Sequence, residues 1–214
     1  MLVSCKDLNQ SSNTENQEIK NDTLPKIEKN QSPLHENLSK EFNYQSFIER
    51  IPTEYFDSCL VNVVVSRKDN ERVFYKVNII STYLLGDETF ENDNVRSYIT
   101  GANADEDVVD NDYGDIVVAD FNFDNFEDFA IKREEGGNGG PLYNFYIQSN
   151  QNFIIDNYLS DTIVWFPNKI DKEQKILQTL VRASAVSVCE ETYKYNSTNK
   201  TWKKIRKQFY GEKY

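Results

Sequence analysis

Asp120–Asp128 of this sequence reads DFNFDNFED, with oxygen-bearing side chains at alternate positions and phenylalanines between them. The β-branched run DIVVAD leads into the stretch and DFAIK leads out of it, so both flanks are expected to be strands. Crowded carboxylates repel one another unless a cation lies among them. The stretch therefore predicts a tight loop between two strands that holds a cation.

Calcium is the cation that this pattern favours, because it accepts many oxygen ligands in flexible geometry. The predicted ligands are four side chains and one backbone carbonyl: Asp120, Asn122, Asp124, Asp128 and, through its carbonyl, Phe126. No nucleophile or activated water is evident beside them, so the predicted role of the ion is structural. The alternative is a solvated acidic turn.

The loop is not an EF-hand, which carries a bidentate glutamate at its twelfth position and continues into a helix. That position is Ile131, within a predicted strand. The pattern D-x-N-x-D-x-x-x-D between strands resembles instead the calcium loop of integrin-type FG-GAP repeats. Asn125 stands where such loops often have glycine, and asparagine tolerates left-handed backbone. The phenylalanines of the segment are expected to pack into the core: Phe121, Phe123, Phe126 and Phe129.

The composition predicts a mainly β protein with antiparallel, sandwich-like sheets. Its 214 residues include 13 Tyr and 13 Phe, and short β-branched runs such as LVNVVV recur. The formal net charge of −11 disfavours nucleic acid and anionic membranes as partners. It favours cations or a basic protein, or serves solubility alone. No apolar run is long enough to span a membrane.

Three segments are predicted: a lipobox-like start over residues 1–5, a disordered linker over 6–41 and a β-rich calcium-binding domain over 42–214. LVSC, ending at Cys5, resembles the lipobox of bacterial lipoproteins. The resemblance implies lipidation of Cys5 and a place in the cell envelope of a Gram-negative bacterium, and a chance match is the alternative. The linker is rich in Asn, Gln, Ser, Lys and Glu and poor in aromatics.

Three cysteines are present, and an odd number in an exported protein needs an explanation. If Cys5 carries lipid, Cys59 and Cys189 remain. They are expected either to form a disulfide that closes a long loop or to be two buried thiols.

Several elements are expected within the domain. A short amphipathic helix is predicted in residues 42–56, ended by Pro52. A hairpin is predicted for residues 59–82 around the polar RKDNE. Further strands are expected in LYNFYIQ, NFIIDNYL, TIVWF, KILQTLVRASAVSV, ETYKYN and TWKKIRKQFY. The last two are expected to form a terminal hairpin, and the lysines of TWKKIRKQFY are typical of a protected edge strand.

The glycine-rich GGNGGP, residues 136–141, precedes a predicted strand rather than a helix, so it is not a phosphate loop. It is expected to be either a plain hairpin connection or a protruding loop that enters a partner's cleft. The residues predicted to contact that partner are Gly137, Asn138, Gly139 and Tyr143. Arg182 is a candidate neighbour of the loop, and its expected role is an ion pair.

The order of these elements from Asn62 to Tyr210 resembles a family of bacterial periplasmic or lipid-anchored β-domain proteins. The family includes immunity proteins that inhibit lysozyme-like effectors of type IV secretion systems. The resemblance is sharpest at the acidic loop and at GGNGG with its following tyrosine. It implies an antiparallel β fold, structural calcium and binding to a peptidoglycan hydrolase. This chain departs from the pattern at Asn125 and in YITGANADEDVVDNDYG, residues 98–114, whose acids are expected to recruit a basic partner or to face solvent.

Enzymatic activity is not expected. The single histidine, His35, lies in the predicted linker, which removes histidine-dependent triads and common zinc sites from the domain. The predicted function is a lipid-anchored, calcium-stabilised inhibitor of a lysozyme-like hydrolase. One alternative is a surface adhesion or ligand-binding module with structural calcium and no inhibitory activity. The other is a hydrolase that uses paired carboxylates.

Overall fold

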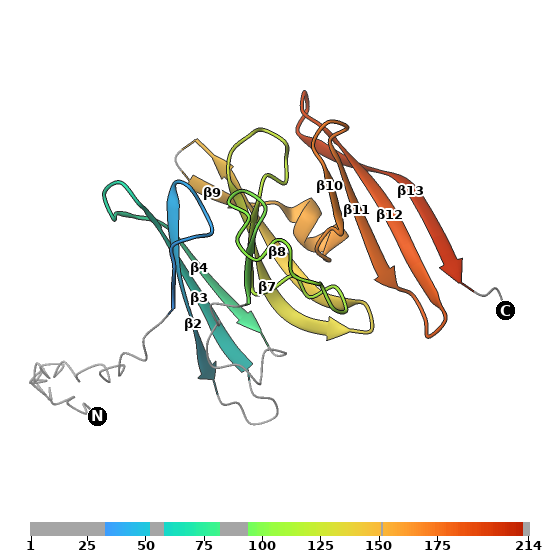
Figure 1. Ribbon diagram of the computed structural model, residues 1–214, viewed down its shortest axis with the longest axis horizontal. Coiled ribbons are helices and arrows are strands. Elements are labelled where there is room, and N and C mark those ends of the chain that lie inside the picture. The colour runs from blue at the N-terminus through green and yellow to red at the C-terminus, as the bar shows by residue number, and fades with distance from the viewer. Residues whose placement is uncertain (1–32, 52–57, 82–93, 151, 212–214) are drawn as a thin grey trace, which may run out of the picture. The chain divides into compact units, whose positions relative to one another are not determined.

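The described residues form three β-sheets (Figure 1). The structure is a computed structural model that describes residues 33–51, 58–81, 94–150 and 152–211. These residues belong to one compact unit, Gln31–Tyr214. Neighbouring strands are antiparallel except β5 and β6, which are parallel. The mainly β prediction is therefore confirmed. Among the described residues, no helix has the length and apolar character needed to cross a membrane.

The sheets follow one another along the chain. The first sheet contains β1 (Leu34–His35), β2 (Phe42–Ile51), β3 (Ser58–Arg67) and β4 (Val73–Ser81). The middle sheet contains β5 (Val95–Ser97), β6 (Ile116–Ala119), β7 (Asp128–Gly137), β8 (Gly140–Ser149) and β9 (Asn152–Ile155). A short π-helix, η1 (Tyr158–Ile163), leads to the third sheet of β10 (Lys169–Asp171), β11 (Ile176–Arg182), β12 (Ser187–Asn196) and β13 (Thr201–Gly211).

The middle sheet is covered on both faces, which explains why β6 is apolar at every position. Ile116 and Val118 face a core shared with the first sheet. Val117 and Ala119 face a second core shared with the third sheet. Phe129 on β7 joins the first core, where its ring stacks on Tyr146 with centroids 4.8 Å apart. The first and third sheets therefore lie on opposite faces of the middle sheet.

The predicted helix in residues 42–56 is wrong where the chain is described, because residues 42–51 form β2. Its side chains alternate with period two, and the inward set is buried: Phe42, Tyr44, Ser46 and Ile48. The buried hydroxyl of Ser46 lies 2.9 Å from Nε2 of His35. The polar Ser46 interrupts the apolar alternation that the sequence would otherwise show. Its hydrogen-bond partner His35 on β1 makes the buried position acceptable for a polar side chain.

Residues 33–41, the end of the predicted linker, belong to the folded part. Leu38 is buried in the first core, and its carbonyl accepts a 2.6 Å hydrogen bond from the hydroxyl of Ser97. The fold therefore begins before residue 42. Cys5, the lipobox and residues 6–32 of the predicted linker lie outside the described residues.

Most other predicted strands are confirmed, including the β3–β4 hairpin and the terminal β12–β13 hairpin. Three assignments differ. NFIIDNYL is a strand only over β9, because Tyr158 and Leu159 belong to η1. TIVWF is not a strand, because Thr162 and Ile163 complete η1 and Trp165 makes only an isolated bridge with Leu142. KILQTLVRASAVSV is not one strand either, because a turn at residues 183–186 separates β11 from β12.

Candidate functional site

The acidic loop, residues 120–128, joins β6 to β7 at one end of the middle sheet. Asp128 is fully buried at the start of β7. Its carboxylate accepts hydrogen bonds from the backbone amides of Phe121 at 2.8 Å and Gln148 at 2.9 Å. This one side chain thus ties the entry of the loop to the neighbouring strand β8.

The inner part of the loop is held by further side-chain acceptors. Asp120 accepts from the amides of Asp124 and Asn125, each at 3.1 Å. Asn122 donates through Nδ2 to Asp124 at 2.8 Å. Asn125 has φ of 71°, the left-handed backbone that its sequence position predicted. Asparagine therefore replaces glycine at this turn without preventing the loop from closing.

Burial places these carboxylates in an unfavourable environment for negative charge. Burial raises the pKa of Asp120, and it raises the pKa of Asp128 well above its ordinary value. The charges of Asp124 and Asp120 raise the pKa of Asp128 further. The ammonium of Lys172 lies 3.8 Å from Asp120 and partly compensates.

The structure gathers the predicted calcium ligands in one loop. In the described part of the chain, no group of three or more His, Cys, Asp or Glu side chains is placed to hold a metal ion. The side-chain oxygens accept hydrogen bonds from the loop instead. Their chemistry suits a hard cation, because a carboxylate oxygen has a second lone pair to offer.

The predicted core packing of the loop phenylalanines is correct at three positions and wrong at the fourth. Phe121, Phe123 and Phe129 are buried, whereas Phe126 is 54% exposed. The amide of Phe126 donates to Asp124 at 2.9 Å. That turn directs the Phe126 side chain away from the core.

Glu127 is a loop residue that the ligand pattern does not mark. Its side chain is buried, and it accepts hydrogen bonds from the hydroxyl of Ser39 and from the amide of Lys40, the latter at 3.0 Å. It therefore links the loop to the segment that precedes β2. Nothing in the local sequence distinguishes this glutamate from a solvated one.

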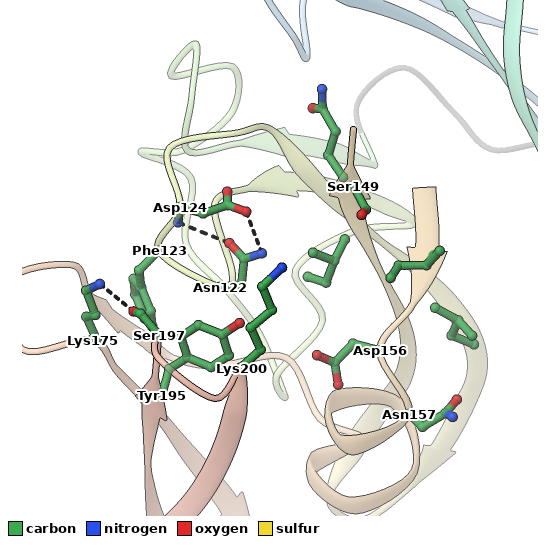
Figure 2. A pocket seen from close by; sticks show the side chains of 14 residues that line it. Asn122, Phe123, Asp124, Ser149, Asp156, Asn157, Lys175, Tyr195, Ser197 and Lys200 are labelled. Carbon is green, nitrogen blue, oxygen red and sulfur yellow. Dashed lines mark hydrogen bonds between the residues drawn. The ribbon is translucent and has the colours of Figure 1, made fainter. Parts of the chain in front are cut away.

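A cavity of about 510 Å³ opens beside the loop (Figure 2). The acidic loop contributes Asn122, Phe123 and Asp124. The other walls come from β8, β9 and the residues after it, β12 and two turns of the third sheet: Ile147, Gln148, Ser149, Ile154, Ile155, Asp156, Asn157, Lys175, Tyr195, Ser197 and Lys200. The sequence did not predict this cavity, because it forms between segments far apart in the chain.

The acidic insert, residues 98–114, is held in place by two buried cations. The stretch from Ser97 to Ile131 contains no Lys or Arg, and the residues bounding it are Arg96 and Lys132. Arg96 donates to the carbonyls of Ala104 and Glu106, both at 3.2 Å. The acidic insert therefore has an ordered backbone, which the buried guanidinium of Arg96 holds in place.

Lys132 forms a compact ion cluster at the end of the insert. Its ammonium lies 2.9 Å from Asp115, 3.2 Å from Asp112 and 3.2 Å from Glu135. Burial alone lowers the pKa of Lys132, but these three carboxylates raise it overall. The lysine therefore stays charged and joins the insert to β7.

The insert packs on the β7–β8 turn, called here the glycine hairpin. Asn111 donates through Nδ2 to the carbonyls of Gly139 and Leu180, both at 3.0 Å. Gly140 has φ of 93°, and a Cβ there would lie 2.3 Å from the carbonyl oxygen of Asp110. Only glycine permits this approach.

The predicted partner contacts of the glycine hairpin divide into two groups. Gly137 and Asn138 are exposed, and Gly139 is partly exposed beside Trp165. Tyr143 was wrongly predicted to face a partner, because it is fully buried in the second core. Its hydroxyl donates to the carbonyl of Gly114 at 3.0 Å. A tyrosine after a glycine loop carries no sequence signal for which way it points.

Arg182 lies beside the hairpin, as the sequence suggested. It lines a second cavity of about 250 Å³ together with Gly139, and it forms an exposed ion pair with Asp110 at 3.5 Å. The predicted ion pair is therefore confirmed.

Of the two alternatives for Cys59 and Cys189, the disulfide is wrong, because they are not bonded to each other, and Cys189 is only partly buried. Cys59 is buried in the core of the first and middle sheets. Cys189 lies on β12 of the third sheet, on the other face of the middle sheet. Sheets pack about 10 Å apart, and a disulfide requires Cα atoms within about 7 Å. A disulfide that closes a long loop is compatible with the connectivity of the chain, but in the fold the middle sheet lies between the two cysteines.

The basic strand β13 is the edge of the third sheet, as predicted. Lys204 and Lys207 lie 2.7 and 2.8 Å from the carboxylate of Glu191 on β12. Burial alone raises the pKa of Glu191, but hydrogen bonds from Lys204, Lys207 and Tyr193 lower it to about 2. The edge is therefore bound to its neighbour by an ionised cluster.

Replacing Glu191 with glutamine is expected to lower the melting temperature at neutral pH. Because the folded pKa lies below the ordinary 4.5, the carboxylate stabilises the fold above pH 4.5, and this contribution is lost as the pH falls to about 2. Thermal melts from pH 7 to 2 should therefore show the gap between wild type and Glu191→Gln closing. Glu173→Gln, at an exposed position, is the matched control, and an equal gap at both pH extremes would contradict the account.

Comparisons with known proteins bear on the fold. No family model matches this chain. No curated protein matches it either. A solved structure of a Xanthomonas type IV secretion system related protein is similar, with a TM-score of 0.53 and 14% sequence identity. The match covers 84% of this chain and 83% of that one. At this identity the similarity establishes a shared fold.

Proposed function

We propose that this protein is a lipid-anchored envelope protein that binds and inhibits a basic, lysozyme-like peptidoglycan hydrolase. The observation that carries the proposal is the acidic insert, whose exposed carboxylates are presented on an ordered backbone. Asp105, Glu106, Asp107 and Asp110 are exposed, while Arg96 holds the segment from beneath. A preorganised surface loses less entropy on binding than a mobile one.

The glycine hairpin extends the same surface. Asn111 connects the insert to Gly139, so the hairpin that carries exposed Gly137 and Asn138 lies beside Asp110. A narrow polar turn flanked by carboxylates suits the cleft of a basic enzyme, because opposite charge accelerates association and fixes orientation. The fold shared with a type IV secretion system related protein is consistent with this role.

A charge-neutralised insert tests the proposal directly. The variant Asp105→Asn/Glu106→Gln/Asp107→Asn removes three exposed charges and keeps side-chain size. It is expected to weaken inhibition of a basic lysozyme by roughly tenfold or more through a slower association rate. The measurement is surface plasmon resonance at two salt concentrations.

The matched control removes three exposed charges elsewhere: Asp69→Asn/Glu71→Gln/Glu173→Gln. It should bind like the wild type. If both variants weaken binding equally, net charge rather than the insert is responsible, and the proposed interface is wrong. If the wild type binds no lysozyme, the ligand-binding module becomes the better account, and the cavity beside the acidic loop favours it.

We also propose that the acidic loop binds a structural calcium ion. The support is the burial of Asp120 and Asp128 within one loop, together with the raised pKa values of both carboxylates. A divalent cation would relieve their mutual repulsion. The predicted holders are Asp120, Asn122, Asp124, Asp128 and the carbonyl of Phe126.

Saturating calcium is therefore expected to raise the free energy of unfolding by about 2.7 kcal/mol at a hundredfold excess over the dissociation constant. Differential scanning calorimetry with calcium, magnesium or chelator measures the effect. Asp124→Ala should abolish the shift, whereas Asp107→Ala, an exposed acid outside the loop, should retain it. A wild-type melting temperature that is identical in calcium and chelator would rule out the calcium site.

A further inference from the structure

We infer that the cavity beside the acidic loop is a binding site for a short peptide with free termini. Its volume of about 510 Å³ is within the range of pockets that bury ligands of tripeptide size. Its walls come from the middle and third sheets, and the residues that give it chemical character lie apart from the acidic insert. The inference therefore does not depend on the proposed inhibition.

The cavity is lined by charged side chains that form no ion pairs in the described part of the chain. Lys175, Lys200 and Asp156 all line the cavity (Figure 2), and none of them takes part in any ion pair among the described residues. Lys175 donates to the hydroxyl of Ser197 at 2.5 Å, which orients its ammonium without neutralising it. Figure 2 shows Lys200 extending into the cavity.

Asp156, between β9 and η1, supplies a carboxylate to the cavity wall. One of its carboxylate oxygens accepts a 2.9 Å hydrogen bond from the amide of Leu159 at the start of η1. Together with burial, its charge raises the pKa of Tyr195, which shares the cavity. A ligand that carries both a carboxylate and an ammonium matches these walls. Asp124 lines the cavity as a second carboxylate. A dicarboxylate would be repelled by Asp156 and Asp124, and a neutral sugar would leave all four charges without an ion partner.

Gln148 is a rigid part of the cavity wall. Gln148 lines the cavity and is 94% buried, since only 6% of its surface is exposed. Its Oε1 has no hydrogen-bond partner among the described residues. Its backbone amide is held by Asp128 at 2.9 Å, which fixes the residue in place. The Oε1 atom is itself buried, so it does not open onto the cavity, and Gln148 shapes the wall without offering this acceptor to a ligand.

The cavity also has an apolar wall. Ile154 and Ile155 on β9 line the same cavity and are 55% and 43% exposed. An aliphatic side chain in the middle of a short peptide would cover them. The predicted arrangement places the peptide carboxylate at Lys175 and Lys200, the ammonium at Asp156, and the central side chain on the isoleucines.

The test uses the full chain and the tripeptide Ala-Leu-Ala with free termini, titrated by ¹H–¹⁵N NMR in the presence of chelator. Saturable shifts are expected at the amides of Ile154, Asp156 and Lys200. The same peptide with an acetylated amino end and an amidated carboxyl end should bind roughly tenfold more weakly or worse, because both charges are lost.

Paired variants separate the site from general charge effects. Lys175→Gln/Lys200→Gln should weaken binding by roughly tenfold. Lys194→Gln/Lys203→Gln removes the same charge from exposed positions of the same sheet outside the cavity and should bind like the wild type. Asp156→Asn keeps an acceptor for Leu159 while removing the charge and should also weaken binding.

Three results would overturn the inference. These are the absence of saturable shifts up to the solubility limit of the free tripeptide, equal binding of the blocked peptide, and equal loss in the two lysine pairs. Because the lysozyme experiments neutralise the acidic insert and these alter the cavity, failure of one proposal is distinguishable from failure of the other.

Discussion

Replacing Phe129 with alanine is expected to lower the free energy of unfolding by about 3–5 kcal/mol. Its ring is fully buried where the first and middle sheets meet. It lies 4.7 Å from Phe153 and 5.5 Å from Tyr44 between ring centroids. The substitution therefore removes aromatic contacts to both sheets and leaves a cavity.

The matched control for this substitution is Phe126→Ala. It removes the same side chain three residues earlier, from a position that is 54% exposed. Its effect should stay within about 0.5 kcal/mol. Urea denaturation followed by tryptophan fluorescence measures both values. Equal effects would show that the two sheets do not share the core described above.

The second large effect is expected at Asp128, whose carboxylate is the buried acceptor for Phe121 and Gln148. Asp128→Ala leaves two buried amides unsatisfied and should cost about 2–6 kcal/mol, at about 1–3 kcal/mol for each amide. Asp128→Asn retains one acceptor and should cost less. The melts are made in chelator, so that the loss of any bound calcium does not contribute.

Asp124→Ala is the comparison for Asp128, because Asp124 is an exposed member of the same loop. Its cost in chelator should be below about 1 kcal/mol. If Asp124→Ala is as damaging as Asp128→Ala, the hydrogen bonds within the loop, rather than the tie to β8, hold the sheet end together.

The sheets themselves were predictable from hydrophobic pattern, because alternation and apolar runs depend only on which faces are covered. The same rule misled at residues 42–51, where the inward Ser46 interrupts the apolar face. Its acceptability depends on His35, which lies eleven residues away on another strand. A local pattern cannot include a hydrogen-bond partner that the fold supplies.

The candidate sites also differ in whether the sequence alone could predict them. The acidic loop was predictable because all its side chains lie within nine residues. The anchoring of the acidic insert by Arg96 was signalled only indirectly, by a cation-free stretch that ends at two buried cations. The cavity with Lys200 and Asp156 was not predictable, since strands from two sheets must meet to form it. For Tyr143 the prediction was wrong in the other direction. Its position after the glycine-rich turn led to its assignment to the surface, although the fold buries it.

We propose above that this protein protects cell walls from a lysozyme-like hydrolase. The most direct measurement is the turbidity clearing of bacterial cell walls by c-type, g-type and i-type lysozymes, with the protein titrated in under saturating calcium or chelator. The account predicts dose-dependent protection against one class, stronger in calcium than in chelator. Unchanged clearing by all three classes at a large excess of protein would contradict it.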